Sequence, residues 1–353
     1  MTIIYFLLLL SIIICIHEAG HLLAAKFFGV YCYEYAFGMG PAIFQKKGKE
    51  TVYSIRALPI GGFVSMAGEP DGDEAYPDVV VPPGRRLTEQ KSWKRIVIML
   101  AGVTMNFLLA LFLFSMIFLM NGSYVESPKP IVNSVVENSP AEKAGFQAGD
   151  VIKKISLEDG TSMTPDTFMD MTYFFLQYEG GKEYYVVERD GQTLELEVLP
   201  EYNEQEQRYT IGIVGGEGTL TKVNILNCWK YGLEEMWSIT KLMFTTILRL
   251  FRGKGLDQLS GPVGIYNAAG EYAALGITAY LFLIAQLSLN VGIFNLLPLP
   301  VLDGGQVVIT AVEGLIGKPL NQKFKLGLMG ACWVLLIGLM VFVTWNDISR
   351  IFS

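Results

Sequence analysis

Long runs of residues without charge constrain this chain more than any other feature. The first 16 residues carry no charge, and after a short polar cluster the apolar run resumes as far as Ala25. A helix of about 24 residues rises about 36 Å, which is enough to cross a hydrocarbon core of about 30 Å. Comparable runs extend over residues 96–120, 272–302 with interruptions, and 326–345. The sequence therefore predicts an α-helical polytopic membrane protein with four transmembrane helices.

The composition agrees with a membrane protein. Hydrophobic residues make up 51% of the 353 residues and charged residues 17%, whereas roughly a quarter of an ordinary soluble domain is charged. The net charge of -7 gives no basic surface, so we expect no nucleic-acid partner. The four cysteines are scattered singly, which argues against a disulfide framework or a thiolate zinc site.

Two alternatives affect the number of spans. The first run could be a cleaved signal peptide, but it lacks a positively charged start and its core contains His17, Glu18 and His21. The segment 223–251 is apolar, yet charged residues recur through it, so we expect helices lying along the membrane interface. Basic residues before the second span and between the last two predict that these ends are cytoplasmic, and that residues 121–271 are extracytoplasmic.

Two regions between the spans have soluble character. Residues 29–92 contain hairpin-like, glycine-bearing stretches, followed by an acidic connection at 69–83 that we expect to be mobile. Residues 127–200 have short alternating stretches separated by Asp190-Gly191, a hairpin signal, and predict an inserted α+β module. The expected order is a first transmembrane helix at 1–28, a cytoplasmic or membrane-dipping β-hairpin region at 29–92, a second helix at 93–121, the module at 127–200, interfacial amphipathic helices at 201–271, a third transmembrane helix at 272–304, a cytoplasmic loop at 305–325 and a fourth transmembrane helix at 326–346.

The first span contains the pattern HExxH. On a helix, His17 and His21 share one face with Cβ atoms about 5–6 Å apart, which suits two imidazoles binding one zinc ion. Ionisable side chains inside a membrane span are costly and are functional or paired by default. The alternative is a buried polar cluster that only joins helices through hydrogen bonds.

A third ligand is needed, because catalytic zinc takes three protein ligands and leaves one position open. The chain has only two histidines, so a carboxylate is expected. Asp303 ends the third apolar region, in the sequence NLLPLPVLDGG. Glu313 and Asp347 are weaker competitors, since the first lies outside the kinked segment and the second lies near the terminus. A helix cap is the structural alternative for Asp303.

Together these motifs resemble the site-2 protease family. HExxH lies in the first span and NxxPxPxLDG in a later one. The stretches 61–64, 260–265 and 344–347 are further matches, and all of these motifs follow the family's order. The bacterial RseP-type branch with a single PDZ domain is most similar, and the run 138–152 resembles the corresponding stretch of PDZ domains. The resemblance implies a zinc metalloendopeptidase of the bacterial inner membrane. His17, His21 and Asp303 would bind one zinc ion per chain, and Glu18 would be the general base.

The resemblance also implies substrate contacts. Asn290 and Asn295 resemble asparagines that hold the substrate backbone, with helix–helix hydrogen bonding as the alternative. Gly61, Gly62, Phe63 and Val64 resemble a membrane-dipping hairpin that pairs with an unwound substrate, with an ordinary cytoplasmic hairpin as the alternative. Expected substrates are single-pass membrane proteins such as anti-sigma factors or remnant signal peptides, cut towards the cytoplasmic side in regulated intramembrane proteolysis. The PDZ domain would dock a peptide or exclude bulky substrate ectodomains.

Two other classes of protein fit parts of the pattern. Intramembrane His, Glu and Asp also build proton relays in transporters, but transporter folds usually show two related halves, and these four spans show no matching pairs. A membrane scaffold that presents a PDZ module would not need three metal ligands and a general base together at bilayer depth. About one zinc ion per chain is expected of the protease alone.

Overall fold

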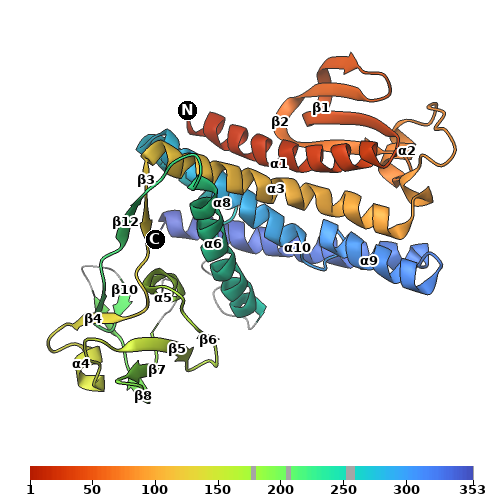
Figure 1. Cartoon of the computed structure of the whole chain (residues 1–353). Coiled ribbons are helices and arrows are strands. Elements are labelled where there is room, and N and C mark those ends of the chain that lie inside the picture. Colours follow the sequence, from red (N-terminus) through yellow and green to blue (C-terminus); the bar gives the residue numbers. More distant parts are fainter. Residues whose placement is uncertain (176–179, 204–207, 252–258, 353) are drawn as a thin grey trace. The chain divides into compact units, whose positions relative to one another are not determined.

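The computed structural model describes residues 1–175, 180–203, 208–251 and 259–352 (Figure 1). The chain forms two compact units, which are described separately. The first contains residues 1–117 and 259–353, and the second contains residues 118–258.

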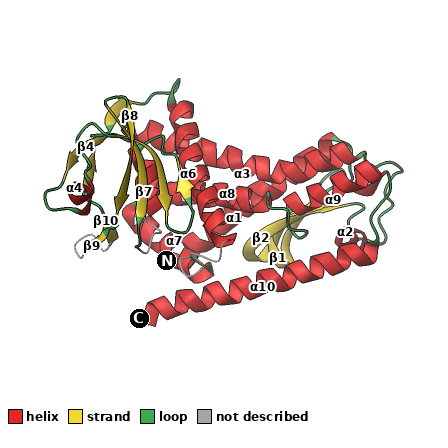
Figure 2. Cartoon of the chain, turned by 90° about the horizontal axis from the view of Figure 1, so that it is seen from below, coloured by secondary structure: helices red, strands yellow, loops and turns green. Residues whose placement is uncertain are grey.

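The first unit is built mainly of long helices, several of which are clear in Figure 2. Among the described residues, α1, α3, α8 and residues 322–349 of α10 are long and apolar enough to cross a membrane. This confirms the expectation of a polytopic helical protein with four candidate spans. The helices are α1 Thr2–Phe27, α3 Ser92–Asn121, α7 Pro262–Leu275, α8 Ile277–Asn295, α9 Asp303–Ile316 and α10 Gln322–Phe352.

The third span is shorter than the expected 272–304. Gly276, with φ of 118°, separates α7 from α8, and α8 ends at Asn295. Pro298 and Pro300 prevent a continuous helix, because proline lacks the amide proton and clashes with the preceding turn. The chain turns and begins α9 at Asp303. This break places Asp303 at a helix start beside the end of a membrane span.

The expected cytoplasmic loop at 305–325 is wrong for most of its length, because α9 extends to Ile316. After Pro300 the sequence contains no further proline before Gly317, which ends α9 in the left-handed conformation. The two glycines after Asp303 allow the tight turn. A Cβ at Gly305 would lie only 2.0 Å from the carbonyl oxygen of Leu299.

The β-hairpin region consists of β1 Cys32–Lys47 and β2 Val52–Met66. Both halves of β2 pair with the first half of β1, so that Tyr35 lies opposite Tyr53 on one side and Val64 on the other. The last part of β2 is therefore an outer edge, and β2 packs along α1 (Figure 1). This arrangement brings an edge strand beside the helix that carries HExxH.

The acidic connection at 69–83 is not the free loop that we expected. It contains the short helix α2 Pro70–Ala75. Just after it, Tyr76 stacks on Tyr33 with ring centroids 5.0 Å apart and donates a hydrogen bond to Glu34. Aromatic stacking and a buried hydrogen-bond acceptor thus fasten the connection to the hairpin.

Glu34 is fully buried at the centre of this attachment. Burial alone would raise its pKa, but hydrogen bonds from Arg56, Ser54 and Tyr76 outweigh burial and lower the pKa below its usual value. The carboxylate therefore stays charged and holds three parts of the hairpin region together.

The second unit is an α+β module followed by a long helix. Its four-stranded sheet has the order β6-β5-β7-β8, and the expected two-residue turn at Asp190-Gly191 joins β7 to β8. The buried core includes Ile152, Ile155 and Tyr185. The elements are β3 Ser123–Glu126, β4 Val132–Val135, α4 Pro140–Ala144, β5 Val151–Leu157, β6 Ser162–Met163, α5 Phe168–Phe175, β7 Glu183–Arg189, β8 Gln192–Val198, β9 Glu201–Asn203, β10 Arg208–Thr210, β11 Ile213–Gly215, β12 Thr219–Lys222 and α6 Cys228–Phe251.

The expected boundary at residue 200 is too early. β11 pairs with β4, and Ile211 belongs to the buried core of the module. The expected helices at 201–271 are correspondingly wrong for residues 201–222, which form β9 to β12 around residues outside the described ranges. Strands β11 and β12 pair with β4 and β3 far away in the sequence, and short strands with distant partners leave little local signal.

Helix α6 has one apolar face that is exposed in this unit. Five apolar side chains at helical spacing are between 49% and 61% exposed, namely Trp229, Leu233, Trp237, Phe244 and Leu248. Other faces of α6 bury Tyr231 and Ile239. The helix is thus amphipathic in the way that is typical of helices at a membrane surface.

Candidate metal centre

The two histidines lie one turn apart on α1 and are both buried, with 7% and 8% of their surface exposed. Nδ1 of His21 lies 2.8 Å from the carbonyl oxygen of Ile98, and this contact requires a proton on Nδ1. Nδ1 of His17 lies 3.1 Å from the side-chain amide of Asn106. Both partners belong to α3, and both contacts leave the Nε2 atoms facing the same space.

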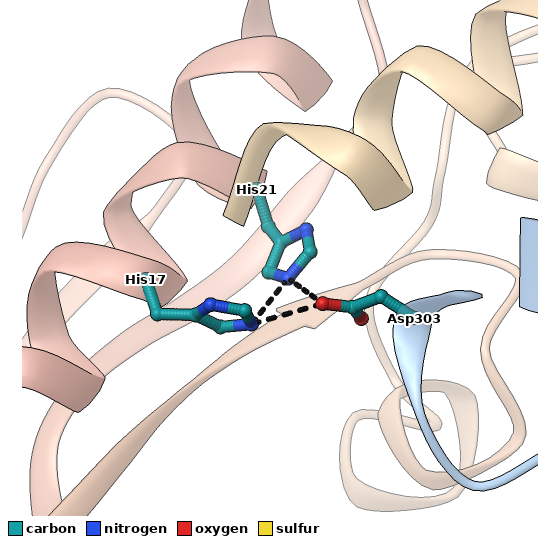
Figure 3. A group of neighbouring side chains, drawn as sticks. All are labelled: His17, His21 and Asp303. Atoms are coloured by element: carbon teal, nitrogen blue, oxygen red, sulfur yellow. Dashed lines mark hydrogen bonds and ion pairs between the residues drawn. The ribbon is translucent and has the colours of Figure 1, made fainter. Parts of the chain in front are cut away.

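Asp303 approaches that space from the first turn of α9 (Figure 3). Its Oδ2 lies 3.0 Å from Nε2 of His17 and 3.6 Å from Nε2 of His21, and the two Nε2 atoms are 3.2 Å apart. The structure thus brings together side chains separated by more than 280 positions in the sequence.

These three atoms suit zinc. Bonds of about 2.0–2.1 Å in a tetrahedral site place neighbouring ligand atoms about 3.3 Å apart, and the three separations bracket that value. Two imidazoles and a carboxylate are also a donor set found in catalytic zinc sites. Among the described residues, His17, His21 and Asp303 are the one group of three or more His, Cys, Asp or Glu side chains that lie close enough together to bind a single metal ion.

Two glycines leave room for the centre. A Cβ at Gly102 of α3 would lie 2.4 Å from Nε2 of His21 and 2.7 Å from Nε2 of His17, which is the space in front of both ligand atoms. A Cβ at Gly20 of α1 would lie 2.3 Å from the carbonyl oxygen of Ala101. Gly20 therefore allows α1 and α3 to approach closely, and Gly102 keeps the space between their side chains open.

A cavity of about 270 Å³ adjoins the triad. Glu18, His17 and Asp303 line it together with Asn295 and apolar side chains of α1 and α8. The backbone amide of Val64, on the outer edge of β2, donates a hydrogen bond of 3.1 Å to Oε2 of Glu18. The carboxylate that follows the first ligand is thus oriented by the hairpin.

The other expected substrate residues are placed differently. Asn290 is half-buried and is not among the residues that line the cavity, and its Oδ1 has no hydrogen-bond partner among the described residues. The carbonyl oxygen of Gly61 accepts a contact of 3.8 Å from the thiol of Cys15. A Cβ at Gly62 would lie 2.7 Å from the carbonyl oxygen of Ala36. Of the expected substrate-binding residues, Asn295 therefore lines the cavity and Val64 contacts Glu18, whereas Gly62 allows close strand pairing.

The competing carboxylates have other partners. Oδ2 of Asp347 accepts hydrogen bonds of 2.9 Å from the backbone amides of Gly261 and Gly264, at the start of α7. Glu313 forms ion pairs with Arg95 and Lys325. The two motifs at 260–265 and 344–347 therefore form a clip between α7 and α10 rather than part of the metal centre.

Sequence reasoning missed Asn106, Gly102 and Gly20. Asn106 is fully buried within the uncharged run at 96–120. A polar amide in the middle of a membrane span is a usable signal, because it needs a partner in a medium without water. The two glycines carried no such signal.

A polytopic helical protein in which two buried histidines and a half-buried aspartate converge beside a cavity has the architecture of a membrane metalloprotease. Sequence comparisons agree. The profile of peptidase family M50 matches residues 5–339. The chain is 32% identical to the regulator of sigma-W protease RasP of Bacillus subtilis, covering 99% of both chains, and 34% identical to a putative zinc metalloprotease of Clostridium acetobutylicum, covering 97% and 96%.

The chain belongs to peptidase family M50 and is a zinc metalloprotease. Its relatives over the full length include the zinc metalloprotease RasP of Bacillus licheniformis, at 32% identity. The family and the four candidate spans identify a membrane-embedded enzyme.

Proposed function

We propose that this enzyme cuts peptide bonds within or beside the transmembrane segments of single-pass membrane proteins. His17, His21 and Asp303 hold one zinc ion per chain in this proposal. The observation that carries it is the depth of the triad: His17 lies ten residues before Phe27, the last residue of α1 (27 − 17 = 10). That is about 15 Å along the helix, or about half of a 30 Å hydrocarbon core.

Glu18 is the proposed general base. When bound, zinc supplies Lewis-acid activation of water and of the scissile carbonyl. Glu18 lines the same cavity as two of the ligands, so its carboxylate can take a proton from water and later deliver it to the leaving amine. The amide of Val64 holds one carboxylate oxygen, which leaves the other for the proton.

Substrate recognition requires hydrogen-bond partners for the backbone of the substrate. A helical substrate hides its carbonyl groups in i to i−4 hydrogen bonds, so it has to unwind, and the released groups need partners in a dry environment. We propose that Asn290 and Asn295 and the outer edge of β2 at Gly61–Val64 supply those partners, the edge by strand addition. Preferred substrates are then transmembrane segments with helix-weakening residues.

We propose that the α+β module is a PDZ domain. In support, Ser139 caps α4 by accepting a hydrogen bond of 3.2 Å from the amide of Glu142, and Gly145 ends α4 with φ of 88° before β5. A capped helix, a glycine turn and a strand thus occupy the run 138–152, whose sequence resembles the corresponding stretch of PDZ domains. The module either docks a peptide on an edge strand or excludes substrates with large folded ectodomains.

The basic flanks support an orientation in a bacterial cell membrane. Lys91 precedes α3, Lys94 and Arg95 lie in its first turn, and Lys323 and Lys325 lie at the start of α10. By the positive-inside rule these ends face the cytoplasm. The active site then opens towards the cytoplasmic side, the module is extracytoplasmic, and the exposed apolar face of α6 lies on the lipid surface.

The test is cleavage by Glu18→Gln in lipid vesicles that contain a candidate single-pass substrate. Loss of a general base lowers the rate by about 10²–10⁴-fold, and zinc content stays near one ion per chain because Glu18 is not a ligand. Glu271→Gln, the same change at an exposed position on α7, is the control and should cleave like the unchanged protein. Cleavage by Glu18→Gln at the unchanged rate would remove Glu18 from the mechanism.

A further inference from the structure

One face of α3 lies against both histidines. Ile98, Gly102 and Asn106 are spaced by four residues and therefore lie above one another on the helix. The carbonyl oxygen of Ile98 contacts His21, and the side chain of Asn106 contacts His17. Gly102 lies between these two contacts and faces both Nε2 atoms. The whole stripe therefore serves the two imidazoles.

The chemistry of a neutral imidazole sets a requirement at Nδ1. When Nε2 binds a metal, the ring proton is on Nδ1, and this N–H needs an acceptor that fixes the tautomer and the ring orientation. For His21 the acceptor is a backbone carbonyl. A helix carbonyl points towards residue i+4, which is Gly102 for Ile98, so the absence of a side chain there keeps this oxygen accessible.

His17 has a different partner. Its Nδ1 contacts the amide of Asn106, which is fully buried and whose Oδ1 has no hydrogen-bond partner among the described residues. The oxygen and nitrogen of an amide exchange places on a half-turn about χ2, and either orientation keeps the heavy atoms in place. Only the orientation that turns Oδ1 towards His17 allows Asn106 to accept a hydrogen bond from Nδ1–H of His17. The side chain is also held at its backbone, because the carbonyl oxygen of Asn106 accepts a hydrogen bond of 3.0 Å from Ser288 of α8.

We infer that Asn106 is a positioning residue. Its side-chain oxygen accepts a hydrogen bond from the Nδ1–H of His17 and so directs Nε2 of His17 to the metal. The inference rests on the proposed zinc site. Asn106 touches neither water nor substrate in this role, and it acts through the tautomer of a ligand.

Zinc affinity, measured by chelator competition on the purified full chain, is the first test. Asn106→Leu removes the acceptor at similar volume and should weaken zinc binding about 10–100-fold, the range found when an outer-shell partner is lost. Asn106→Asp keeps an acceptor and should bind zinc within a few-fold of the unchanged protein. Ser115→Ala, which changes another buried polar side chain of α3, is the control and should have no effect.

The pattern of these variants separates the possible explanations. If the unchanged protein binds no zinc, the proposed metal site itself fails. If the unchanged protein binds zinc and Asn106→Leu binds it equally well, the role of Asn106 is overturned. Equal weakening in the Leu and Asp variants would also overturn it, because a merely structural side chain would not be rescued by an acceptor.

A spectroscopic test does not depend on a folded Leu variant. Because the chain has only two histidines, ¹⁵N-histidine labelling gives four ring nitrogens in the NMR spectrum. The zinc-loaded protein should show two protonated Nδ1 atoms, and the His17 Nδ1 proton should shift downfield in Asn106→Asp, because a charged acceptor makes a stronger hydrogen bond. A protonated Nε2 on His17 in the zinc-loaded protein would contradict the inference.

Discussion

Gly102 is the residue at which the metal centre is least tolerant of change. The methyl group of Gly102→Ala would lie 2.4 Å and 2.7 Å from the ligand nitrogens of His21 and His17. We expect at least a 100-fold loss of cleavage together with loss of bound zinc, measured by metal analysis. Gly327→Ala on α10 has open space around the added methyl group and is the matched control. Retained zinc in Gly102→Ala would show that the centre has a different geometry.

The residues of the centre differ in how far the sequence reveals them. His17 and His21 are readable because HExxH has a fixed helical spacing, and Asp303 because the chain offers no third histidine. Asn106 was missed because an uncharged amide does not interrupt a hydrophobic run. Gly102 could not be found, since its role depends on where α3 meets α1, and no local pattern encodes a contact between helices.

At the scale of elements, Asp347 stabilises the start of a helix from a distance. Its carboxylate on α10 accepts from two amides at the start of α7, a position where a negative charge also favours the helix dipole. Asp347→Ala should destabilise the protein by about 1–2 kcal/mol, seen as a lower midpoint of thermal unfolding in detergent. Zinc content should not change. An unaltered midpoint would mean that the clip between α7 and α10 carries little stability.

Strand β7 contains a buried acid whose protonation affects stability. Burial raises the pKa of Glu183 to about 7, although a hydrogen bond from Tyr185 opposes the rise. Between the unfolded pKa of about 4.5 and about 7, the folded state holds a proton that the unfolded state has lost. The contribution of Glu183 to the stability of the module is therefore largest below about pH 4.5 and falls by about 2–3 kcal/mol as the pH rises to about 7.

Hydrogen exchange of β7 amides, corrected for intrinsic rates, measures this effect in the full chain. Protection should fall as the pH is raised from 5 to 7.5. Glu183→Gln, which cannot ionise, should remove the fall. An equal loss of protection in both proteins would exclude Glu183 as the cause.

Elements were predictable to the extent that their signal is local. Four helices were found from uncharged runs of about 20 residues, and the turn at Asp190-Gly191 from its residue types. Strands β11 and β12 have no such local signal, because they pair with β4 and β3, about 80 to 100 positions earlier. Helix α9 lies where we expected a cytoplasmic loop. The lysines at 318, 323 and 325 favoured that loop, whereas the prolines before Asp303 mark where a new helix begins.

For the whole molecule, the role of the α+β module can be tested by a precise excision. Glu126 at the end of β3 pairs with Thr219 at the start of β12. Replacing residues 127–218 by Asn-Gly would join the two strands through a two-residue hairpin turn and keep their ladder. If the module excludes bulky substrates, the shortened enzyme should cleave a membrane substrate that still carries a large folded ectodomain. If that substrate stays intact while a trimmed one is cut at the normal rate, exclusion is wrong and peptide docking is favoured.

The central claim is that two imidazoles and one carboxylate bind a single zinc ion in the first unit. X-ray absorption at the zinc edge of the purified full-length enzyme tests it most directly. The predicted result is about one zinc per chain, bound only by nitrogen and oxygen at about 2.0–2.1 Å with two imidazoles, and loss of this signal in Asp303→Asn. A sulfur shell near 2.3 Å, or an unchanged spectrum in Asp303→Asn, would contradict the claim.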